Sequence, residues 1–192
     1  MKNNRMTPMI SALTWALSLG ALLLATGCNS SDSGAGPAGG NPHGMGIANC
    51  DALLTSAEAA VILGGPIVKI TPRDTGNILN CTYDREIPTG DFFAPEIRIS
   101  AFTTDGFLAP FHSTAPAFYD ALDARTAASI KTTLTGIGTK AMYQLNPRKL
   151  SLYKGDVYAE IYCRPHGIPA IDTSVAAFEG AKAAAVNVAA KL

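Results

Sequence analysis

Strict alternation of apolar and polar residues constrains the fold of this chain more than any other feature. In Val157–Arg164 successive residues divide between two faces, and Glu96–Ala101 alternates strictly. A period of two residues is typical of a strand with one buried face, because successive side chains point to opposite sides of a sheet. In the first of these strands the predicted inward residues are Val157, Ala159, Ile161 and Cys163, and the outward ones are Tyr158, Glu160, Tyr162 and Arg164.

Helices and strands follow one another in a repeated order. A capping box at Thr55 and Glu58 starts the first helix, and two further helices are expected at 115–125 and from about Ser174. We therefore predict an α+β domain, an antiparallel sheet of about six strands with helices on one face and the other face open. The order also predicts a duplicated unit of one helix and three strands. The expected strands are 67–71, 78–84, 96–101, 129–145, 149–153 and 157–164.

The first 28 residues have the pattern of a bacterial lipoprotein signal peptide. Lys2 and Arg5 precede an apolar run, which ends in small residues directly before Cys28. A basic start, an apolar centre and a small residue at the cleavage site are typical of such a signal. We expect residues 1–27 to be removed and Cys28 to carry lipid. The alternative is a plain membrane-spanning anchor, for which about 20 apolar residues are needed.

The segment after Cys28 differs in composition from the rest of the chain. Residues 28–49 are rich in Gly, Ser and Pro and are expected to be a flexible tether, whereas 50–192 forms a single envelope domain. Asn29 stands where an aspartate signals inner-membrane retention in enterobacterial lipoproteins. Resemblance to those proteins favours the outer membrane, facing the periplasm, in a Gram-negative host. In other hosts the anchor lies on the outer face of the plasma membrane.

Charge is balanced overall but unevenly placed. Loss of Lys2 and Arg5 leaves 13 basic against 15 acidic residues, which gives no reason to expect nucleic acid as a partner. One interpretation is that the basic residues of 125–154 neutralise acidic residues elsewhere in the domain. The other is that they gather at one end and meet an anionic envelope component, with Arg148 and Lys149 as candidate binding residues. The six are Arg125, Lys131, Lys140, Arg148, Lys149 and Lys154.

The sequence from Cys50 onward contains several short motifs: Cys50, Leu53-Leu54-Thr55 with Glu58, Leu63-Gly64, Cys81-x-Tyr83, Gly136-Ile137-Gly138 with Ala141, and Gly155-Asp156. Together they resemble a family of small uncharacterised envelope lipoproteins, best known from actinobacteria and related to sensor-kinase ectodomains. The resemblance implies an α+β module that binds a ligand or partner, with no established activity. It also implies that Cys50 and Cys81 are paired.

Cys163 has no counterpart in the family pattern. Its inward position predicts a buried thiol that acts as a small hydrophobic residue, and the alternative is pairing with Cys50 or Cys81. With His166 it offers only two metal ligands, so we expect neither a metal nor another cofactor.

The chain shows no nucleophile motif and no oriented acid–base pair. We therefore expect a non-enzymatic, lipid-anchored binding module. The alternatives are a structural accessory subunit of an envelope assembly and a periplasmic hydrolase. Tyr158 and Tyr162 are the candidate aromatic platform for a sugar, peptide or protein, although tyrosine also commonly fills half-exposed strands.

Overall fold

The computed structural model describes residues 47, 49–75, 78–87, 89, 94–103, 113–165 and 174–192 of the 192-residue chain. Contacts divide the chain into two units, Met1–Pro37 and Ala38–Leu192, and every described residue belongs to the second. The predicted signal peptide, Cys28 and most of the predicted tether therefore lie outside the described residues.

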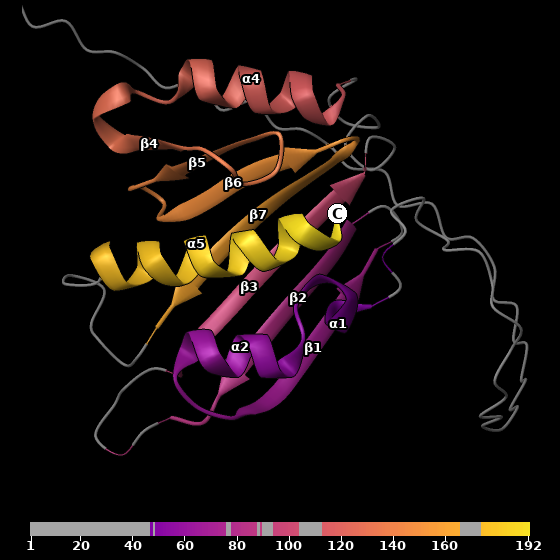
Figure 1. Cartoon of the computed structure of the whole chain (residues 1–192), viewed down its shortest axis with the longest axis vertical. Helices are drawn as coiled ribbons and strands as arrows, with labels where there is room; N and C mark the ends of the chain where they lie inside the picture. The colour runs from indigo at the N-terminus through magenta and orange to yellow at the C-terminus, as the bar shows by residue number, and fades with distance from the viewer. Residues whose placement is uncertain are drawn as a thin grey trace, which may run out of the picture. The chain divides into compact units, whose positions relative to one another are not determined.

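The described part is built on one seven-stranded sheet in which all neighbouring strands are antiparallel. The strand order is β1-β2-β3-β7-β6-β5-β4, so one meander starts at each edge and the two meet where β3 pairs with β7 (Figure 1). This confirms the predicted antiparallel α+β architecture. The strands are β1 (Ile67–Asp74), β2 (Ile78–Arg85), β3 (Glu96–Thr103), β4 (Lys131–Leu134), β5 (Lys140–Gln144), β6 (Lys149–Lys154) and β7 (Val157–Arg164).

The seventh strand arises where the sequence predicted one continuous strand over 129–145. Residues 128–130 instead form a short 3₁₀ helix, η1 (Ala128–Ile130), and the remainder folds back as β4 and β5. Gly136 and Gly138 have φ angles of 77° and 58°, a left-handed conformation that glycine adopts without steric cost. A Cβ at Gly138 would also lie 2.6 Å from the Tyr153 carbonyl oxygen. The two glycines thus make a turn that reverses the chain.

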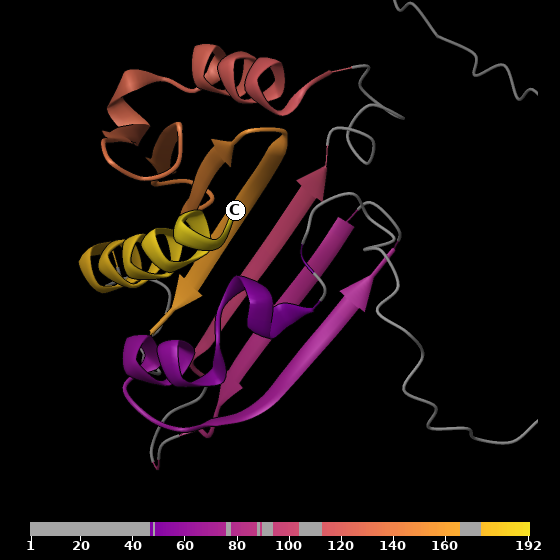
Figure 2. The same ribbon diagram turned by 45° about the vertical axis from the view of Figure 1, so that its right-hand side comes forward.

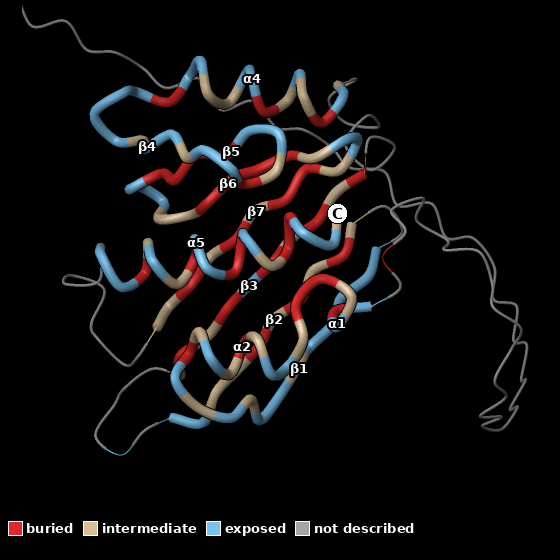
Figure 3. The backbone as a smooth tube through the Cα atoms, in the orientation of Figure 1, coloured by how far each residue is buried: buried red, intermediate tan, exposed pale blue. Residues whose placement is uncertain are grey.

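Three helices cover one face of the sheet, and this helix-covered face holds the main core (Figures 1 and 3). They are α1 (Cys50–Leu53), α2 (Ser56–Leu63) and α5 (Ser174–Lys191). The predicted capping box starts α2, because the Thr55 hydroxyl accepts from the Glu58 N–H and the Glu58 carboxylate accepts from the Thr55 N–H. The alternation predicted for β7 is also present, since Ala159, Ile161 and Cys163 are buried in this core.

Helix α4 (Ala115–Arg125) lies on the opposite face, so the prediction of helices on one face only is wrong. Its Tyr119 ring packs edge-on against Tyr153, with ring centroids 5.4 Å apart, and Phe118 packs in the same way against Tyr158 at 5.1 Å. Tyr158 alternates along β7 with the residues of the main core. An amphipathic pattern shows that a helix has a buried side but does not show which face of a sheet receives it.

The two halves of the domain differ in ways that leave the predicted duplication unconfirmed. The first half has three strands and places its helices against the main core, whereas the second has four strands and places α4 on the other face. Figure 2 shows that α4 and α2 lie at opposite ends of the row of strands.

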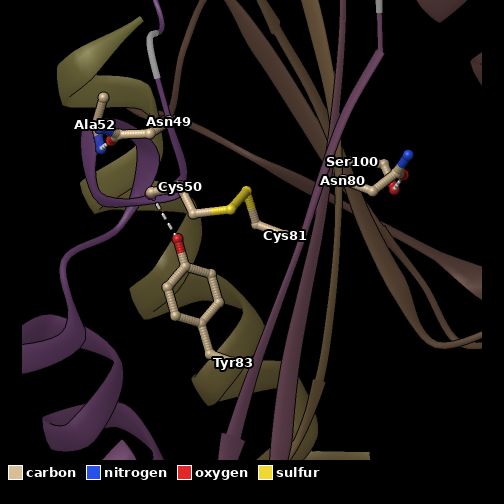
Figure 4. Close-up of a disulfide and its surroundings, with 7 residues drawn as sticks. All are labelled: Asn49, Cys50, Ala52, Asn80, Cys81, Tyr83 and Ser100. Carbon is tan, nitrogen blue, oxygen red and sulfur yellow. Dashed lines mark hydrogen bonds between the residues drawn. A yellow bond between two sulfur atoms is a disulfide. The ribbon is translucent and has the colours of Figure 1, made fainter. Parts of the chain in front are cut away.

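A disulfide joins Cys50 in α1 to Cys81 in β2, as the family resemblance implied (Figure 4). The Tyr83 hydroxyl donates a 2.6 Å hydrogen bond to the Cys50 carbonyl oxygen, so α1 is held to β2 at a second point. Cys163 is a buried free thiol. Burial in the main core raises the pKa of this thiol to about 12, which keeps it protonated at neutral pH.

Candidate functional site

The face of β1, β2, β3 and β7 that points away from α1, α2 and α5 carries mainly polar side chains, and we call it the open face. In Figure 4 the bonded pair Asn80 and Ser100 lies across the strands from the disulfide. The alternation of the strands places the polar row on one side and the core residues on the other. The described polar residues of this face include Thr71, Arg73, Asn80, Thr82, Arg98, Ser100, Glu160, Tyr162 and Arg164.

A shallow groove of about 360 Å³ runs over β7 at the border of the open face. Arg98 and Ser100 of β3 line one side, and Pro147 and Lys149 line the other. The remaining lining residues, Glu160, Ile161 and Tyr162, belong to β7. Since neighbouring strands lie about 4.8 Å apart, strands β3 and β6 on the two sides of β7 are about 10 Å apart.

Tyr162 is flanked by cations from both neighbouring strands. Arg98 pairs with it across β3 and β7, and the guanidinium carbon lies 4.6 Å from the centre of the tyrosine ring. On the other side, pairing of Leu150 with Ile161 brings Lys149 to the level of Tyr162. A guanidinium stacked on an aromatic ring is attracted by the ring's negative face, so its orientation is fixed before any ligand arrives.

Two carboxylates hold these cations in place. Arg98 donates to Glu96 Oε1 from Nε at 3.2 Å and from a terminal nitrogen at 2.8 Å, and Arg164 contacts the same oxygen at 3.2 Å. The second carboxylate, Glu160, accepts from Lys149 at 2.5 Å and from the Tyr158 hydroxyl at 2.9 Å. The groove is therefore lined by charged side chains whose positions are set by one another.

Tyr158 is not part of an exposed platform, which corrects one of the two aromatic positions predicted from the sequence. The residue is completely buried between β7 and α4, where it packs against Phe118 and Phe102. Burial raises the pKa of its hydroxyl, and the neighbouring Glu160 carboxylate raises it further. Its contribution to the groove is indirect, because its hydroxyl orients Glu160.

The six basic residues of 125–154 do not gather at one end of the domain. Strand register places Lys140 and Lys154 at the opposite end of β5 and β6 from Lys131 and Lys149. Three of the six pair with acidic side chains: Lys131 with Asp123, Lys140 with Asp120, and Lys149 with Glu160. These pairs agree with the interpretation that the basic residues of 125–154 neutralise acidic residues elsewhere in the domain.

The turn between β5 and β6 contains the other predicted binding residue, Arg148. It is half-buried and has a φ angle of 59°, an uncommon backbone conformation for a residue with a side chain. The turn also supplies Pro147 to the groove wall. Arg148 is therefore next to the groove in sequence, but Lys149 is the member of this predicted pair that lines it.

Several expected features lie outside the described residues, including lipidation at Cys28 and any role of His166. Among the residues that are described, His, Cys, Asp and Glu side chains form no group of three or more suited to a metal ion. Within the same ranges, no helix combines the length and the apolar character needed to cross a membrane.

Sequence reasoning missed Arg98, Ser100 and Glu160 as groove residues. The alternation of β3 and β7 placed all three on the outward side, but the pairing of β3 with β7 was not predicted. That pairing joins the two meanders and cannot be read from the order of the strands alone.

No family model matches the chain, and none of the curated proteins or solved structures is significantly similar to it.

Proposed function

We propose that this protein is a lipid-anchored envelope lipoprotein whose folded domain binds a ligand or partner through the open face and performs no catalysis. The groove beside Tyr162 is the observation that supports this proposal most strongly. It lies over inner strands of the sheet, and its charged side chains are held by mutual contacts. Such preorganisation lowers the entropy cost of binding.

The anchoring half of the proposal depends on the first 28 residues. The basic start, the apolar run and the small residues before Cys28 support export and lipidation. The Cys50–Cys81 disulfide fits the same location, because structural disulfides persist in oxidising compartments. The protein would then stand in the periplasm on the outer membrane of a Gram-negative host, or on the outer face of the plasma membrane elsewhere.

Anchoring is tested by metabolic labelling with an acyl analogue. The native protein should incorporate the label, and Cys28→Ala should lose it and be mislocalised, because the proposed lipid is attached at Cys28. Cys163→Ala is a suitable control, since its thiol is buried in the core. Labelling of the Cys28→Ala protein would contradict the anchoring proposal.

The binding role is tested by photocrosslinking in intact host cells. A photoreactive amino acid is placed at Thr82 on the open face, next to Arg98 in the register, or at Val61 on α2 as a control. Val61 is 82% exposed and lies on the helix-covered side. Reproducible adducts from Thr82 but not from Val61 are expected. The proposal is wrong if Thr82 gives no more adduct than Val61.

A further inference from the structure

The groove offers side chains, and not the backbone, to a ligand. Strands β3, β7 and β6 each have a neighbour on both sides, so their peptide groups are engaged in the sheet. The two edges are poorly suited to adding a peptide strand: β1 contains a bulge and Pro72, and β4 has only four residues. Recognition through main-chain hydrogen bonds, as in strand addition, is therefore disfavoured.

Donors and acceptors face the same groove. Arg98 and Lys149 are donors, the Glu160 carboxylate is an acceptor, and the Ser100 hydroxyl, which donates to Asn80 Oδ1, can accept a further hydrogen bond. A hydroxyl group on a ligand both donates and accepts, so a surface of this mixed character suits a ligand with many hydroxyl groups. Tyr162 and Pro147 add apolar surface against which the C–H side of a sugar ring can pack.

The charges around Tyr162 favour a ligand that carries an acid group. Arg98, Lys149 and Arg164 carry three positive charges, against two negative charges on Glu96 and Glu160. The two Arg98 nitrogens that contact Glu96 hold the guanidinium in one orientation. Its exposed side chain, 55% accessible, remains open to an anion at the mouth of the groove.

We propose that the groove binds one ring of an anionic saccharide, a sugar that carries a carboxylate or a phosphate. The acid group lies between Arg98 and Lys149, the sugar ring packs on Pro147 and on the face of the Tyr162 ring that Arg98 does not cover, and the sugar hydroxyls bond to Glu160 and Ser100. This inference rests on the proposed function and names the class of ligand for the same site.

The test uses the full lipidated chain, purified in a detergent without a sugar headgroup. Binding of glucuronic acid, glucose 6-phosphate, glucose and inorganic phosphate is followed by nuclear magnetic resonance titration. Both acidic sugars should bind about tenfold or more tightly than glucose, since a hydrogen bond to a charged group is worth more than a neutral one. They should also bind more tightly than inorganic phosphate, which lacks the ring. Equal binding of glucose and the acidic sugars would contradict the inference.

Two pairs of variants assign the effect to the groove. Arg98→Gln should reduce the affinity for both acidic sugars about tenfold, whereas Arg73→Gln, at an exposed arginine on β1 of the same face, should leave it unchanged. Tyr162→Leu should weaken binding of every sugar, and Tyr162→Phe, which keeps the ring, should retain most of it. If Arg73→Gln weakens binding as much as Arg98→Gln, the anion is attracted by the general charge of the face.

The outcome of the sugar titration can be distinguished from the outcome of the crosslinking experiment that tests the proposed function. Crosslinking from Thr82 without binding of either acidic sugar would leave the open face as a binding surface and reject the saccharide. Binding of free phosphate as tight as that of glucose 6-phosphate would also reject it, because the ring would then contribute nothing.

Discussion

Gly180 of α5 lies directly over the thiol of Cys163 in β7, and a Cβ atom at Gly180 would be only 2.5 Å from the Cys163 sulfur. The helix can therefore approach the sheet closely at this point. Small residues continue the same contact, because Ala181, Ala184 and Ala185 are all completely buried. The buried thiol thus fills the space beside the side of α5 that carries glycine and alanine.

Gly180→Ala should destabilise the domain, although alanine favours a helix by about 1 kcal/mol relative to glycine. Overpacking of this kind typically costs about 1–3 kcal/mol, and the sulfur is held in the core. The free energy of unfolding in urea measures the effect. Cys163→Ala removes the sulfur, so the double variant should recover much of the stability lost in Gly180→Ala. A Gly180→Ala protein more stable than the native one would show that the helix is not in close contact there.

Removal of the disulfide should lower the free energy of unfolding, because the unfolded chain without the cross-link has more conformational entropy. The bond joins residues 31 apart in sequence, and closing a loop of this length is worth about 3–4 kcal/mol on the chain-entropy model. The Cys50→Ala/Cys81→Ala protein should unfold at lower urea concentration but keep its fold, because Tyr83 still bonds to the residue-50 carbonyl. Cys163→Ala serves as the thiol control. An unchanged unfolding midpoint in the double variant would contradict the prediction.

The sequence predicted local structure better than the arrangement of the elements. The alternation in β3 and β7 and the capping box at Thr55 depend on neighbours in the chain, and the structure confirms them. One continuous strand was expected over 129–145, but the chain reverses at Gly136 and Gly138 between the two short strands β4 and β5. The side of the sheet on which α4 packs depends on contacts of Phe118 with Tyr158 and of Tyr119 with Tyr153. These partners are distant in sequence, so a local pattern does not reveal them.

The groove residues also divide into those that the sequence alone could suggest and those that depend on how the strands and helices are arranged. Tyr162 and Lys149 could be selected from residue type and charge, and both line it. Tyr158 could not be distinguished from Tyr162 by alternation, because both occupy the same side of β7 and only the position of α4 buries one of them. Arg98 became recognisable only once β3 was placed beside β7.

Acid should weaken the contact between α2 and the end of α5. The hydrogen bond from Lys191 lowers the pKa of Glu58 below its ordinary value of 4.5, and the Thr55 backbone N–H lowers it further. Because the pKa is lower in the folded state, the stabilisation is complete above about pH 4.5 and is lost as the pH falls through the folded value. The partly exposed pair is expected to contribute about 1 kcal/mol or less.

Comparison of Glu58→Gln with the native protein checks this pH dependence. The difference in unfolding free energy should be present at neutral pH and should disappear well below pH 4.5. Lys191→Met should reproduce part of the loss at neutral pH, because the Thr55 contact remains. A difference that is constant with pH would show that the Glu58 charge is not involved.

Hydroxyl-radical footprinting tests most directly whether the open face is occupied where the protein works. Oxidation of Tyr162 is compared between intact envelopes and the purified protein, with Val61 and Val68 as exposed controls on α2 and β1. We predict that Tyr162 is protected in the envelope while the rates at both valines change little. Equal oxidation of Tyr162 in the two samples, with unchanged controls, would contradict the claim that this face binds an envelope component.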